Sequence, residues 1–118
     1  MRLRAIRGAI TVDSNERDAI LDGTEELVQE VMERNSLDPG DIVSCIFTCT
    51  GDLDAAFPAE AARRLGLSAV PLLCAQEIEV PGSLERVIRL MVHCYSDEAQ
   101  HVYLREATAL RRDLEGAQ

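Results

Sequence analysis

The segment Arg86-Val87-Ile88-Arg89-Leu90-Met91-Val92-His93-Cys94-Tyr95 decides how this sequence is interpreted. Its residues are mostly apolar on both faces of an extended chain, which is typical of a central, covered β-strand. Arg89 interrupts this pattern, with Val87 and Met91 as its neighbours on the same face. Because an unpaired buried charge is very costly, Arg89 must meet an anion. That anion is either one of the chain's own carboxylates or a bound ligand.

The remaining sequence predicts a mixed sheet built around this strand. Hydrophobic periodicity and β-branched residues predict four more strands, at Arg2–Val12, Ile42–Thr50, Ala69–Val80 and Val102–Leu110. A long amphipathic helix is predicted from about Glu16 to Arg34, and a short one at Ala59–Leu65. This order predicts an α+β fold, with about five strands and one main helix layer, in a single domain spanning residues 1–118. One long helix covers one face of such a sheet poorly, so we expect the chain to oligomerise.

Two details of the long helix follow from its sequence. Asp13 followed by Glu16 predicts a capping box at its start, with Ser14 or Asn15 as alternative caps. Gly23 lies inside the helix and costs about 1 kcal/mol relative to Ala, so the helix must depend on docking more than on propensity.

Composition and charge exclude several classes of protein. The 118 residues carry a net charge of −9, with a pI near 4.6, which argues against nucleic-acid binding. Residues 13–41 hold ten acids against two arginines, so most of the negative charge belongs to the predicted long helix. The longest uncharged stretch, Leu65–Gln76, has 12 residues and is too short to cross a membrane. The N-terminus has no apolar segment typical of a secretory signal, so we expect a cytoplasmic protein.

The cysteines and histidines do not form a pattern that indicates a metal site or a redox pair. No two cysteines are spaced C-x-x-C, and the two histidines are isolated from acids at ligand spacing; the residues are Cys45, Cys49, Cys74, Cys94, His93 and His101. The sequence also shows no Ser-His-Asp set and no glycine-rich phosphate loop.

A second group of polar residues accompanies Arg89. Arg7 shares strand parity with Ala5 and Ala9, and it either extends to solvent at a sheet end or binds a ligand. Glu77 follows an apolar run and is either the internal partner of Arg89 or an acceptor that faces a ligand. Tyr103 and Arg111 flank the last predicted strand. Arginines and a tyrosine hydroxyl without a nucleophile indicate a site for a small polycarboxylate.

Five ordered segments resemble the monofunctional chorismate mutases of the trimeric α/β-barrel type. The likeness runs from about residue 2 to Leu114 and is carried by Arg4–Ala9, Asp52–Ala59, Val70–Glu77, Arg86–Arg89 and His101–Leu104. The resemblance implies a homotrimer whose sheets pack into a barrel-like core with the helices outside. It also implies active sites between subunits that convert chorismate to prephenate in phenylalanine and tyrosine biosynthesis, without a metal or a cofactor.

The resemblance also implies roles for individual residues. Arg89 matches the cation that contacts the ether oxygen and a carboxylate, and Glu77 matches the acceptor for the ring hydroxyl. Arg7 and Tyr103 match residues that hold the side-chain carboxylate. The Cys74 region, with Leu73, Ala75 and Gln76, lines the side of the ring. Phe57 and Arg63 match positions supplied across the subunit interface, and Leu110 and Arg111 match the C-terminal segment that closes over the site. Glu60 departs from the pattern, since family members can carry a basic residue there.

The chemistry of this reaction agrees with the residues. A unimolecular [3,3] rearrangement needs the substrate folded into a chair and a positive charge beside the ether oxygen, and it needs no nucleophile. A guanidinium on a strand can supply that charge. Two alternatives remain at this point: a non-catalytic trimeric module that senses a carboxylated metabolite, and a trimeric deaminase-like enzyme, which would need a way to activate water.

Overall fold

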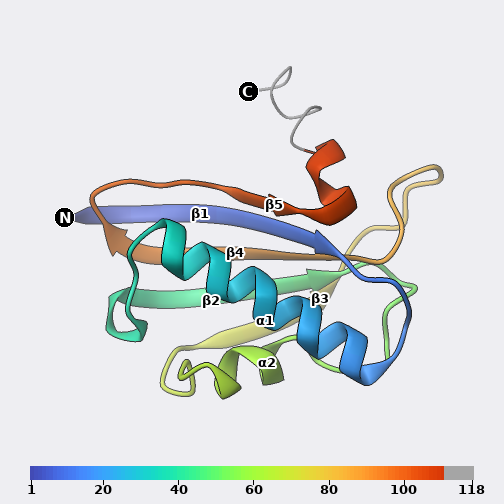
Figure 1. The fold of residues 1–118 in the computed structure, drawn as a ribbon, viewed down its shortest axis with the longest axis horizontal. Coiled ribbons are helices and arrows are strands. Elements are labelled where there is room, and N and C mark those ends of the chain that lie inside the picture. Colours follow the sequence, from blue (N-terminus) through green and yellow to red (C-terminus); the bar gives the residue numbers. More distant parts are fainter. Residues whose placement is uncertain (111–118) are drawn as a thin grey trace.

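The computed structural model describes residues 1–110, which form one five-stranded sheet, an 18-residue helix and a second helix of 6 residues (Figure 1). The elements are β1 (Arg2–Thr11), α1 (Arg17–Arg34), β2 (Ile42–Cys49), α2 (Ala59–Arg64), β3 (Leu72–Gln76), β4 (Val87–Ser96) and β5 (Val102–Leu104), with short 3-10 turns at Pro39–Asp41 and Arg105–Ala107. The predicted α+β architecture of about five strands is therefore confirmed.

The strand order is β3-β2-β4-β1-β5, so the strand that carries Arg89 lies at the centre of the sheet. β4 runs antiparallel to both of its neighbours, β1 and β2. The edge strands β5 and β3 run parallel to β1 and β2. The sheet is thus mixed, and its central strand is hydrogen-bonded on both sides.

Helix α1 lies across one face of the sheet and forms the core with it (Figure 1). Ile6 and Ile10 of β1 and Leu90 of β4 point to this face and pack in one cluster with Ile20 and Leu27 of α1. Gly8 lies directly below the helix, where an added Cβ would be 3.1 Å from Leu27 Cδ1. The close packing of α1 supports the expectation that docking stabilises this helix.

Within residues 1–110, neither α1 nor α2 covers the opposite face of the sheet, and the helical turn that contains Ala107 packs on part of it, against Ala9 and Val87. This face carries large apolar side chains that remain partly or largely exposed: Leu3 (54%), Ile46 (37%), Leu73 (61%), Met91 (36%) and Tyr95 (49%). These residues share one face because the strand registers pair Leu3 with Tyr95 and Ile46 with both Met91 and Leu73. We call this surface the open face. A contiguous apolar surface of this kind marks an interaction site.

Three predicted boundaries were wrong. The third strand is Leu72–Gln76 instead of Ala69–Val80, because the chain beyond it forms an exposed loop that ends in a turn at Pro81 and Gly82. The fifth strand ends at Leu104, because Arg105 has a φ of +55° and begins a helical turn. Helix α1 has Glu16 at its N-cap, with no capping hydrogen bond from a side chain. The amide of the alternative cap, Asn15, instead hydrogen-bonds Asp54 and Ala55.

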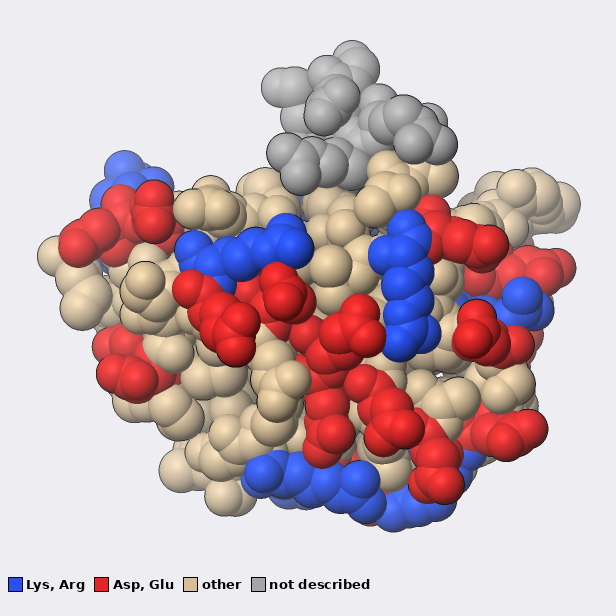
Figure 2. All heavy atoms as spheres, in the orientation of Figure 1, with Lys and Arg blue, Asp and Glu red and all other residues tan. Residues whose placement is uncertain are grey.

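The acidic side chains of α1 lie on its outer surface. Figure 2 shows acidic groups gathered over this helix. None of the acids of α1 is buried: Asp18, Asp22, Glu25, Glu26, Glu30 and Glu33. Within residues 1–110, neither helix combines the length and hydrophobicity needed to cross a membrane.

Candidate active site

Arg89 projects from the middle of β4 on the open face. Its neighbours across the sheet are Ala9 on β1 and Thr48 on β2. The Arg89 Nε–H donates to both carboxylate oxygens of Glu77, at 3.1 Å to Oε1 and 3.0 Å to Oε2. The two side chains are only partly exposed, 42% for Arg89 and 17% for Glu77. Glu77 is therefore an internal partner of Arg89, and this pairing is compatible with a second role as an acceptor that faces a ligand.

This ion pair leaves the outer end of the guanidinium uncommitted. Within residues 1–110, neither Nη atom of Arg89 makes a hydrogen bond or ion pair with the protein. The plane of the guanidinium is fixed through Nε, and its two terminal nitrogens keep their four N–H donors. A donor group of this shape suits a carboxylate or another oxygen anion.

Glu77 is positioned by the strand that precedes it and by two neighbours on β2. It comes directly after β3, and its backbone N–H donates to the carbonyl of Cys49, at 2.9 Å. The hydroxyl of Thr48 donates to Glu77 Oε2, at 2.8 Å. Glu77 thus receives hydrogen bonds from β2 and β4 at once. Its Oε1 carries fewer of these bonds than Oε2.

A cavity of about 320 Å³ lies over this part of the open face. Arg7 of β1, Arg89 of β4 and Tyr103 of β5 line it together, as expected for a site that binds a small polycarboxylate. Ile46 and Met91 supply apolar surface to the same cavity. The three strands adjoin one another in the order β4-β1-β5, which explains how side chains 96 residues apart in the sequence meet.

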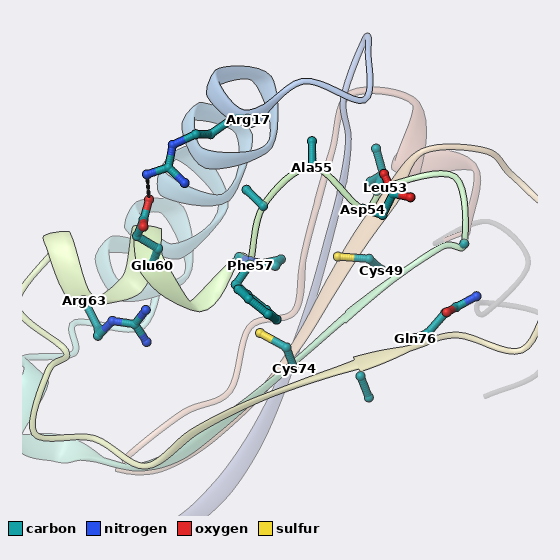
Figure 3. Close-up of a pocket in the computed structure, with 14 residues that line it drawn as sticks. Arg17, Cys49, Leu53, Asp54, Ala55, Phe57, Glu60, Arg63, Cys74 and Gln76 are labelled. Atoms are coloured by element: carbon teal, nitrogen blue, oxygen red, sulfur yellow. Dashed lines mark hydrogen bonds and ion pairs between the residues drawn. The ribbon is translucent and has the colours of Figure 1, made fainter.

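A second cavity, of about 580 Å³, lies between α2, the chain before it and the ends of β2 and β3 (Figure 3). Of the predicted site residues, Phe57, Arg63, Cys74, Ala75 and Gln76 line it. It shares no lining residue with the first cavity. The Phe57 side chain is largely exposed (73%). A single chain therefore separates the predicted residues into two groups.

Charged side chains gather at the edge of the second cavity. Glu60 forms ion pairs with Arg17 of α1 and with Arg64 of α2. Figure 3 shows the Arg17 contact, which joins the start of α1 to α2. Arg17 and Arg63 line this cavity together with Asp54 and Glu60, so its lining carries two arginines and two acids.

The remaining predicted residues lie apart from both groups. Leu73 is exposed on the open face. Leu110 is partly buried and, like Tyr103, packs against a small cluster that contains Ala9 and Val87, so it lies on the Tyr103 side of the first cavity. Arg111 is outside the described residues.

Cys45 and Cys49 are not activated as nucleophiles. Burial, together with a smaller contribution from the neighbouring Cys74, raises the pKa of each of these two thiols to about 12. Both thiols stay protonated at neutral pH, where a thiolate would be needed for nucleophilic attack. Ser44 Oγ lies 3.2 Å from His93 Nδ1 on the open face, but no carboxylate within residues 1–110 hydrogen-bonds this histidine. A Ser-His-Asp set is therefore not assembled in this part of the chain.

Two residues of this region were not predicted as site residues. Thr48 lies in a sequence typical of an ordinary strand, and only its cross-strand register with Arg89 reveals its contact with Glu77. Arg17 lines the second cavity, but nothing in the sequence distinguishes it from a surface residue of the predicted long helix.

Comparison with known proteins places the chain among enzymes of one kind. A family model described as chorismate mutase type I matches residues 3–114. The chain is 50% identical to the chorismate mutase AroH of Thermus thermophilus, over 98% of this chain and 99% of that protein. It is 41% identical to the chorismate mutase AroH of Bacillus subtilis (strain 168), over 97% and 94% of the two chains.

A solved structure gives the same result. The fold matches that of a chorismate mutase from Clostridium thermocellum with a TM-score of 0.87 and 50% sequence identity, covering 90% of this chain and 98% of the other. Sequence and structure agree over nearly the whole length, so the chain belongs to the type I chorismate mutase family.

Proposed function

We propose that this protein is a chorismate mutase, an isomerase that converts chorismate to prephenate by a [3,3] rearrangement in phenylalanine and tyrosine biosynthesis. The observation that carries the proposal is the state of Arg89. Its Nε is held by Glu77, both Nη atoms have no protein partner within residues 1–110, and Arg7 and Tyr103 line the same cavity. Such a site can bind a dicarboxylate and leave a positive charge directed at a third oxygen.

The reaction needs little more than this arrangement. Its barrier falls when the flexible substrate is held in the chair form, because the two reacting carbons are then already close. The breaking C–O bond places negative charge on the ether oxygen, and a fixed cation stabilises that charge more strongly in the transition state than in the ground state. Arg89 supplies this charge and stays protonated. No metal or cofactor takes part.

The site residues contact different parts of the substrate. Arg89 contacts the ether oxygen and one carboxylate, Glu77 accepts a hydrogen bond from the ring hydroxyl, and Arg7 and Tyr103 hold the side-chain carboxylate. Cys74 lines the side of the ring, together with the neighbouring residues Leu73, Ala75 and Gln76. Phe57, Arg63, Leu110 and Arg111 complete the enclosure.

These contacts need more than one copy of the chain. The two cavities share no lining residue, and the open face leaves large apolar side chains exposed. We propose a cytoplasmic homotrimer of single-domain subunits, in which the open faces pack together. Phe57 and Arg63 of one subunit then reach the Arg7–Arg89–Tyr103 cavity of the next. The family model over residues 3–114 supports the assignment of the whole chain to one domain.

Purified protein tests the function directly. Without added metal or cofactor, it should consume chorismate, followed as loss of chorismate absorbance, and yield one prephenate per chorismate. An inert preparation of well-folded protein would refute the proposal. If that preparation binds chorismate without turnover, the sensing module becomes the correct interpretation.

A further inference from the structure

We infer that Thr48 is a positioning residue for the rearrangement, acting through Glu77. This inference rests on the proposed function, and it assigns a task to a residue outside the set matched to the family. Thr48 lines the same cavity as Arg89, and its hydroxyl donates to Glu77 Oε2 at 2.8 Å. Its effect on substrate is indirect.

The register of the sheet places this contact. Thr48 is directly opposite Arg89 on the antiparallel strand pair and directly opposite Ala75 on the parallel pair. Glu77 is two residues beyond Ala75, so its side chain returns over the same face. Thr48 is thus the β2 residue that lies between the cation and the carboxylate. β-Branching restricts its χ1 angle, which limits the directions in which the hydroxyl can point.

The hydroxyl makes the two oxygens of Glu77 unequal. Oε2 accepts from both Thr48 and Arg89, whereas Oε1 shares only the Arg89 Nε–H. A carboxylate oxygen has two lone-pair sites, so Oε1 retains room for a further donor. We assign Oε1 as the oxygen that accepts from the substrate's ring hydroxyl. Thr48 therefore selects this oxygen and stops the carboxylate from rotating.

The same contact also orients Arg89. Because Glu77 holds Nε, any rotation of its carboxylate turns the plane of the guanidinium and moves both Nη atoms. A hydrogen bond to a charged group contributes more than one between neutral groups, so its loss should be visible in the rate. The loss should affect kcat more than KM, since Arg7 and Tyr103 still hold substrate.

The test compares Thr48→Val, which keeps the shape and β-propensity of the side chain, with Thr48→Ser, which keeps the hydroxyl. Thr48→Val should lower kcat about tenfold with KM changed less than about threefold, and Thr48→Ser should stay within about threefold of wild type. Combining Thr48→Val with Glu77→Ala should give no further loss beyond Glu77→Ala alone, because the two residues act as a unit. Ser44→Ala is the matched control, since it removes a hydroxyl from the same face of β2 without touching Glu77.

Four results would overturn the inference: near-normal kcat in Thr48→Val, an equal loss in Thr48→Ser, an equal loss in Ser44→Ala, or an additive loss in the double variant. Crystal structures without substrate separate this inference from the proposed function. The Glu77 carboxylate should keep its orientation in Thr48→Ser and turn in Thr48→Val, whether or not the wild type consumes chorismate. An unmoved carboxylate in Thr48→Val refutes the inference, and an inert wild-type enzyme refutes the function.

Discussion

Replacement of Arg89 by alanine removes a cation whose terminal nitrogens lie over the first cavity. The structure gives two separate losses. The first is the transition-state charge: a single preorganised donor at a developing oxyanion contributes about 3–4 kcal/mol, which corresponds to roughly 10²–10³-fold in kcat. The second is the ion pair with Glu77, whose partners are 42% and 17% exposed and which therefore adds no more than about 1 kcal/mol to stability.

The loss of rate and the loss of stability can be measured separately. Initial rates of chorismate consumption at saturating substrate should fall roughly 10²–10³-fold in Arg89→Ala, while the thermal unfolding midpoint moves by only a few degrees. Arg89→Lys should also be poor, because an ammonium group cannot hold Glu77 through Nε and present two further nitrogens. A kcat of Arg89→Ala within tenfold of wild type, in protein that remains folded, would refute the role given to this residue.

Three further predictions follow from other parts of the molecule. Gly23→Ala should destabilise the protein by about 1–2 kcal/mol in chemical denaturation, although alanine has the better helix propensity, because the added Cβ would lie 2.5 Å from Val12 Cγ1. In a Val12→Ala background, the same substitution should be neutral or stabilising. Burial raises the pKa of Cys45 from 9.0 to about 12, so the unfolded chain loses the Cys45 proton at a lower pH than the folded chain. The free energy of unfolding should therefore fall as pH rises from 9 towards 12. A Cys45→Ala variant should show a shallower fall, and an equal slope would contradict the assignment. Arg17→Ala should raise KM for the dianionic substrate several-fold, because the negative charge of Glu60 is then less compensated. Glu60→Gln should restore KM in that background. A double variant with a KM as high as that of Arg17→Ala would contradict this explanation.

The central strand was predictable because residues 86–95 are apolar on both faces, and the structure makes them the middle strand. Only one of these faces is buried in the chain, and the other carries the exposed Met91 and Tyr95 of the open face. The third strand was predicted too long because Ile78 and Val80 are apolar and β-branched, yet they are exposed by 89% and 59% in a loop. Periodicity cannot distinguish a loop of this kind from a strand when the chain leaves the sheet.

The sequence could predict which residues belong to the site, but not how they are arranged in space. The parity of Arg89 in its strand showed that it needed an anion, but only the register of three strands shows that Glu77 and Thr48 both reach it. Those pairings join segments far apart in the chain, which local patterns do not encode. Phe57 and Arg63 lie at a different cavity from Arg89. The family resemblance implied this separation by matching them to positions across the subunit interface, whereas no local pattern indicates it.

The proposed catalysis depends on one guanidinium and the oxygen of a breaking bond. A crystal structure with a bicyclic mimic of the rearrangement's transition state is the direct test of this contact. We expect an Arg89 Nη atom to lie within hydrogen-bond distance of the mimic's ether oxygen while Nε remains on Glu77. Arg89 Nη atoms directed instead at carboxylates of the protein, or at solvent, would contradict it.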